Sequence, residues 1–105
     1  MNEARDLPAR EVYQILKDVA LGVGSLRRMS SRPWKDIFTG TMTSEVDGWM
    51  LVLHSEGGRL GYCESCTSPD SRSASLEDWH RFGTNPVDFL SAWEREKVER
   101  SLNQA

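Results

Sequence analysis

The chain has 105 residues with 13 basic and 16 acidic side chains, which gives a formal net charge of −3 at pH 7. This acidic balance argues against direct binding of DNA or RNA, because domains that bind nucleic acids present a basic face. The length predicts a single domain over 1–105 that can bury a core without disulfides or metal ions.

The beginning of the chain contains no apolar segment of the kind found in signal peptides, and no run approaches membrane-spanning length. We therefore expect a cytoplasmic protein with no membrane contact. Because cytoplasmic thiols stay reduced, a disulfide between Cys63 and Cys66 is not expected.

The first expected element is a helix over residues 8–23. Pro8 suits a first helical position, where its missing N–H costs nothing. Gly22 and Gly24 supply stop signals. The apolar residues recur at spacings of three and four, which predicts one apolar helix face. These residues are Val12, Ile15, Leu16, Val19, Ala20 and Val23.

A short helical turn is expected after this helix, beginning at Ser31 with Pro33 near its first position. Large aromatic and aliphatic side chains dominate small cores. We therefore expect Trp34, Ile37 and Phe38 to be buried.

A β-meander of three strands is expected in the middle of the chain. Asp47-Gly48 is typical of a two-residue type I′ hairpin turn, and Gly57-Gly58 offers a second. The first turn predicts a register and one apolar sheet face. The predicted pairs are Val46 with Trp49, Ser44 with Leu51 and Met42 with Leu53.

The second hairpin follows by the same reasoning. It pairs Glu56 with Arg59, a favourable cross-strand charge pair. The predicted register then sets Tyr62 opposite Leu53 and Cys63 opposite Val52, with Cys63 and His54 on the same face.

Helices return after the polar segment that follows Cys66. Ser75 begins a short helix that ends at Gly83, and Asn85 with Pro86 starts another turn. Ser91 opens a last helix over about residues 92–103. The expected fold is therefore α+β: an N-terminal helix, a three-stranded antiparallel β-meander, and C-terminal helices packed on one face of the sheet.

The two cysteines stand at the C-x-x-C spacing found in zinc sites and redox pairs. Zinc needs four ligands, and the chain offers only Cys63, Cys66, His54 and His80 besides carboxylates. Strand alternation predicts that Cys66 points to the face opposite Cys63. We interpret the pair as one buried thiol and one thiol near a strand end, with no metal ion or cofactor. The alternative is a small zinc- or thiol-dependent domain that uses both cysteines.

No constellation of nucleophile, base and oxyanion donors is recognisable, so we expect a protein that is not an enzyme. Trp79 and Trp93 stand in short, polar helices that cannot bury every large side chain, and Trp is a favoured anchor of protein interfaces. We therefore predict a partner-binding surface from one of these two residues and part of the first helix. The predicted residues are Val12, Ile15, Leu16, Val19, Trp79 and Trp93.

The runs VDGWMLVLHSEGGRLGYCESCTSPDSRS and FGTNPVDFLSAWEREKVERSL resemble a family of short, mostly uncharacterised pseudomonad proteins, over roughly residues 7–104. Size, acidity and element order are also similar to those of small quorum-sensing antiactivators of the QslA type. That resemblance implies binding to a LuxR-type transcription factor and a block of its dimerisation. The protein is then an inhibitory protein-interaction module, and a homodimer is expected in the absence of the partner.

Overall fold

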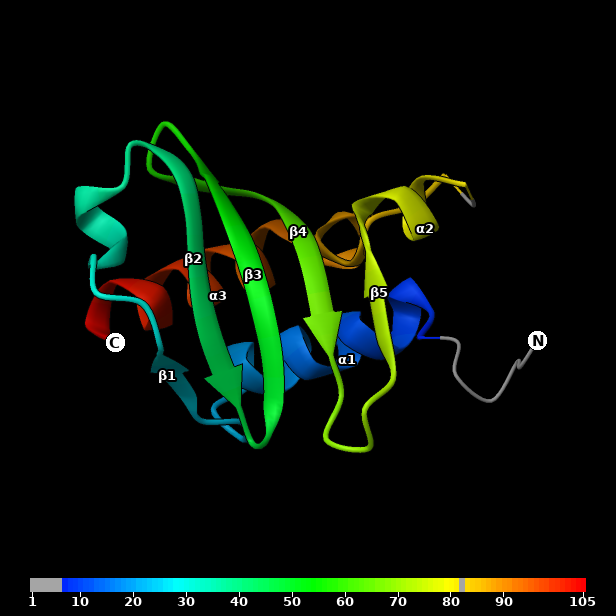
Figure 1. Ribbon diagram of the computed structural model, residues 1–105. Helices are drawn as coiled ribbons and strands as arrows, with labels where there is room; N and C mark the ends of the chain where they lie inside the picture. Colours follow the sequence, from blue (N-terminus) through cyan, green and yellow to red (C-terminus); the bar gives the residue numbers. More distant parts are fainter. Residues whose placement is uncertain (1–6, 82) are drawn as a thin grey trace.

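The computed structural model describes residues 7–81 and 83–105. They form a five-stranded antiparallel sheet in the order β1-β2-β3-β4-β5, with helices on one of its faces (Figure 1). The elements are α1 (Ala9–Ala20), β1 (Leu26–Arg28), η2 (Trp34–Asp36), β2 (Thr39–Val46), β3 (Trp49–Glu56), β4 (Arg59–Thr67), β5 (Ser73–Ser75), α2 (Leu76–His80), η3 (Pro86–Phe89) and α3 (Ala92–Gln104). The α+β class is confirmed, but the prediction of three strands is wrong.

The two additional strands lie at the edges of the sheet and have three residues each. β1 pairs with β2, and β5 pairs with β4. Three residues are too few to show the alternation of apolar and polar side chains that marks a longer strand. Both edges of the sheet are therefore short.

The helix α1 ends three residues earlier than expected, at Ala20. Gly22 has a φ of +78°, and the N–H groups of Gly22 and Val23 donate to the carbonyls of Val19 and Asp18. This is the Schellman arrangement, which closes a helix with a glycine in the left-handed conformation. It turns Val23 into solvent, where its side chain is 76% exposed, instead of into the predicted apolar face.

The hairpin of β2 and β3 has the predicted register. Val46 pairs with Trp49, and the ladder continues without a shift to Thr39 and Glu56. Asp47 and Gly48 have φ values of +49° and +91°, as a type I′ turn requires. The predicted apolar face is confirmed by its buried side chains, which are Met42, Val46, Leu51 and Leu53, with Trp49 packed against the core.

The hairpin of β3 and β4 begins as predicted, with Glu56 opposite Arg59, but its register then changes. Tyr62 pairs with His54, and Cys63 pairs with Leu53, so both predicted pairings of these residues are wrong. The cause is a register shift between His54 and Ser55, where the additional residue on β4 is Gly61. Such a bulge inserts one residue and moves every later side chain to the other face.

The segment before β2 supplies two core side chains rather than three. Trp34 and Ile37 are buried as predicted, whereas Phe38 is 76% exposed. Ile37 is extended, with φ −107° and ψ 95°, so consecutive side chains point to opposite sides of the chain. The Ser55 hydroxyl donates to the Ile37 carbonyl at 2.7 Å and fixes this orientation.

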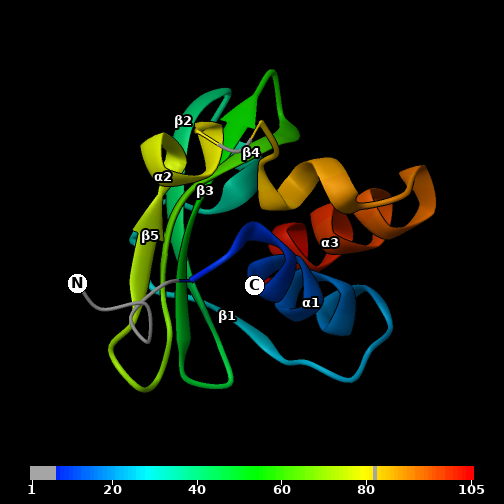
Figure 2. The same ribbon diagram turned by 90° about the vertical axis from the view of Figure 1, so that its right-hand side faces the viewer.

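The C-terminal helices begin where their capping residues predict. The Ser75 N–H donates to the Asp78 carboxylate, and the Glu94 N–H donates to the Ser91 hydroxyl. α3 and α1 lie side by side against the same face of the sheet (Figure 2). Within the described part of the chain, no helix is long and apolar enough to cross a membrane.

Candidate functional site

The two cysteines lie together on the inner face of the sheet. Cys63 pairs with Leu53 and Cys66 with Leu51, and both thiols are free and buried. A second register shift, between Val52 and Leu53, leaves Glu64 as the additional residue between them. The prediction that Cys66 points to the face opposite Cys63 is therefore wrong, whereas its predicted place near a strand end is confirmed, one residue before β4 ends at Thr67.

Burial makes both thiols poor nucleophiles. It raises the pKa of Cys66 to about 12 and raises that of Cys63 well above its usual value, with the neighbouring Cys66 adding to the effect. Because the thiolate is the reactive and metal-binding form, these sulfurs behave as small core side chains. The Cys63 thiol donates to the Ser65 carbonyl at 3.3 Å.

His54 does not share the face of Cys63, contrary to the predicted register. Its ring stacks on Tyr62 with centroids 4.4 Å apart, and its Nε2 lies 2.9 Å from the Glu56 carboxylate. Among residues 7–81 and 83–105, no group of three or more His, Cys, Asp or Glu side chains could hold a metal ion.

Most of the predicted partner-binding residues are core residues. Val12, Leu16 and Val19 are buried under the sheet, and Ile15 is partly buried against the core. Trp79 is only 2% exposed, and its Nε1 donates to the Leu7 carbonyl at 3.0 Å. The prediction that these side chains face a partner is thus corrected for all but Ile15 and Trp93. A one-turn helix can bury its single aromatic side chain when neighbouring elements cover it.

Trp93 is a surface residue, as predicted. It lies in the first turn of α3 and is 52% exposed, although Val98 and Leu102 of the same helix are fully buried. The Lys97 ammonium lies 5.4 Å from the centre of the indole ring. Trp is among the side chains that most often act as anchors of protein interfaces.

A groove of about 680 Å³ lies at the beginning of α1, beside β5 and α2. Its size is within the range of ligand-binding pockets. The Arg10 guanidinium lies 5.0 Å from the centre of the Phe89 ring in its wall. The lining residues are Leu7, Pro8, Ala9, Arg10, Ser73, Ala74, Asp78, Trp79, Arg81, Thr84 and Phe89.

One protein-family model covers all the helices and strands described above. The model of a domain of unknown function, DUF7693, matches residues 6–104. The chain belongs to the DUF7693 family. No curated protein and no solved structure matched this DUF7693 chain, so those two comparisons add no activity or ligand.

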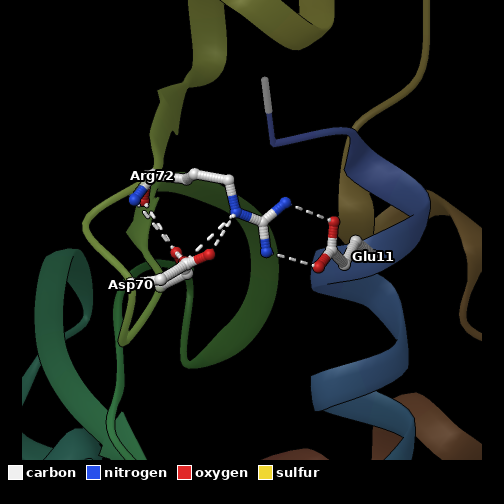
Figure 3. Close-up of polar contacts among 4 residues, drawn as sticks. Glu11, Asp70 and Arg72 are labelled. Carbon is white, nitrogen blue, oxygen red and sulfur yellow. Dashed lines mark hydrogen bonds and ion pairs between the residues drawn. The ribbon is translucent and has the colours of Figure 1, made fainter. Parts of the chain in front are cut away.

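An ion-pair network joins α1 of this DUF7693 domain to the β4–β5 loop next to the groove. Arg72 donates to both carboxylate oxygens of Glu11 and to the Asp70 carboxylate, which also accepts from the Ser68 hydroxyl (Figure 3). Glu11 and Arg72 stand 61 positions apart, and no sequence pattern in either segment connects them. The network holds β5 against the beginning of α1 and thereby fixes two walls of the groove.

Proposed function

We propose that the protein acts by stoichiometric binding to another protein and that Trp93 lies at the centre of the binding surface. The exposure of Trp93 supports this proposal most, because the other three Trp residues are buried in the core or packed against it. Burial of both cysteines argues against a thiol-dependent or zinc-dependent domain, because it disfavours the thiolate form that such a domain needs.

The proposed partner is a transcriptional regulator of the LuxR type, and the proposed effect is a block of its dimerisation in the cytoplasm. This narrower proposal rests on the resemblance to quorum-sensing antiactivators in size, acidity and element order. An inhibitor of this kind needs no active site, since it works by covering a surface. Without the partner, a homodimer that covers Trp93 is expected.

The experiment that tests the proposal is a pull-down from a lysate of the native host, followed by calorimetry with the purified partner. We expect saturation at one copy of this chain per partner chain. Catalytic turnover of a small molecule at sub-stoichiometric protein would contradict it. Stoichiometric zinc in the purified protein would contradict the assignment of the cysteines to the core.

A further inference from the structure

The groove beside β5 has an excess of positive charge. Arg10 and Arg81 are both exposed at its walls, and Asp78 is the one acidic residue among the described residues that line it. The Asp78 carboxylate already accepts the N–H of Ser75 at 2.9 Å as the cap of α2. The described lining therefore carries two guanidinium groups and one carboxylate that already has a structural partner, and the groove favours an anionic group.

One wall of the groove is the edge strand β5, and its register with β4 shows which of its backbone groups point away from the sheet. The Ser68 N–H donates to the Arg72 carbonyl at 2.7 Å. Hydrogen-bonded pairs alternate along an antiparallel ladder, so Cys66 and Ala74 form the next such pair and the backbone of Ser73 turns away from β4. The Ser75 N–H, which points to the same side by this alternation, indeed leaves the ladder and donates to Asp78.

Ser73 is exposed and lines the groove, and among the described residues β5 pairs with β4 alone. The aromatic rings of Trp79 and Phe89 supply apolar walls nearby. A backbone donor and acceptor, apolar walls and flanking cations are the features by which sheet edges bind extended peptides.

We infer that this groove binds an extended, acidic peptide segment, which pairs with the backbone of Ser73 and sets a carboxylate between Arg10 and Arg81. The inference rests on the proposed function, because it names the chemistry of a partner segment. It concerns a different surface from the one around Trp93, so each can fail without the other. Arg10 is held in place by its position over the Phe89 ring, which reduces the cost of ordering it.

The probe is a fluorescein-labelled hexapeptide of alternating valine and glutamate, blocked at both ends and titrated with the full chain by anisotropy. We expect saturable binding with one site, at least about tenfold weaker when glutamine replaces glutamate, because hydrogen bonds to charged groups are the stronger ones. The same peptide with N-methylated alternate backbone nitrogens should bind at least about tenfold more weakly, since it cannot pair with a strand.

The protein variants are Arg10→Gln and Arg81→Gln, each expected to weaken binding about tenfold. Arg100→Gln is the matched control, because Arg100 is exposed on α3 and does not line the groove. Equal binding of the glutamate and glutamine peptides overturns the inference. Equal binding of the N-methylated and unmodified peptides also overturns it. So does succinate that displaces the labelled peptide as effectively as the unlabelled peptide does, or a second copy of the chain that covers the groove.

A partner recovered by pull-down separates this inference from the proposed function. If Trp93→Ala loses binding to this partner while Arg10→Gln and Arg81→Gln bind it with wild-type affinity, the proposed function stands. The groove is then not the docking site of the partner. Weaker binding of partner and peptide in the groove variants, with no change in Trp93→Ala, supports the groove and contradicts the surface around Trp93.

Discussion

The guanidinium of Arg72 donates from its two terminal nitrogens to the two carboxylate oxygens of Glu11, at 3.0 and 2.7 Å. This geometry is specific to arginine, whose planar fork matches a carboxylate. The two side chains are 20% and 37% exposed, so they are partly shielded from water and salt. The pair joins α1 to the loop before β5 and is the main polar link between these two segments in Figure 3.

Replacement of Arg72 by Lys should lower the midpoint of thermal unfolding by several degrees, because an ammonium cannot make the paired bonds. The matched control is Arg27→Lys, since Arg27 pairs with Glu45 at the surface and is 69% exposed. Surface ion pairs contribute little to stability. Melting curves by circular dichroism measure both changes. Equal midpoints for the two variants would show that the Arg72–Glu11 pair has no special role.

Acid should destabilise the protein through Asp70. A hydrogen bond from Ser68 and then one from Arg72 hold the pKa of Asp70 below its usual value. The unfolded chain therefore binds the proton more readily, so the stabilisation is present at neutral pH and is lost as the pH falls below about 4. Melting midpoints between pH 7 and pH 3 should fall more steeply for the wild type than for Asp70→Asn. Parallel curves for the two proteins would contradict this assignment.

The cysteines should be unreactive in the folded protein. Ellman's reagent should modify both thiols at once in guanidinium chloride and only slowly in buffer, because burial raises their pKa values. Cys63→Ala should be tolerated better than Cys63→Ser, since serine buries a hydroxyl in place of a weakly polar thiol, at a cost of about 1–3 kcal/mol. Rapid modification of the native protein would show that the pair is accessible and open to chemistry.

The turn between β2 and β3 should not tolerate a β-branched residue. Gly48→Val should be strongly destabilising, because Gly48 has a φ of +91° and a Cβ there would lie 3.3 Å from Pro69. Gly48→Asn is the matched control, since asparagine adopts the left-handed conformation far more readily. Chemical denaturation measures the free energy of unfolding of each. If valine and asparagine are equally tolerated, the type I′ turn is not formed in solution.

Local signals in the sequence were sufficient for the elements whose form is set locally. The Asp47-Gly48 turn determined the register of β2 and β3, and the capping residue Ser91 determined the start of α3. The register of β4 was missed because it depends on bulges at Gly61 and Glu64. An isolated glycine inside a strand is a signal of a bulge, so Gly61 could have indicated the first one, whereas Glu64 gives no such signal.

Tertiary packing decided which aromatic side chains are buried. Trp79 stands among polar neighbours, yet α2 places it against Leu7 and the core. Phe38 directly follows the buried Ile37, and the two form an apolar pair in the sequence. The extended backbone at Ile37 nevertheless turns the Phe38 side chain into solvent. The groove likewise brings together residues from four elements, so neither its charge nor its sheet edge was visible in the sequence.

Trp79 and Trp93 should therefore differ in what their loss does. Trp79→Ala removes a buried indole and should cost about 3–5 kcal/mol of folding free energy. Trp93→Ala removes a half-exposed one and should leave the melting midpoint almost unchanged. Melting curves of both variants check this difference. Similar destabilisation by the two changes would show that Trp93 is also a core residue and could not be a free anchor.

The most direct test of the account is the affinity of Trp93→Ala for the recovered partner, measured by calorimetry beside the wild type. Phe38→Ala is the matched control, because Phe38 is an exposed aromatic residue that precedes β2 and lies beside the turn between β3 and β4. We predict that Trp93→Ala weakens binding by about 2 kcal/mol or more, roughly thirtyfold, as an anchor at an interface centre does. Phe38→Ala should bind like the wild type. Wild-type affinity in Trp93→Ala would contradict the proposal that this surface binds the partner.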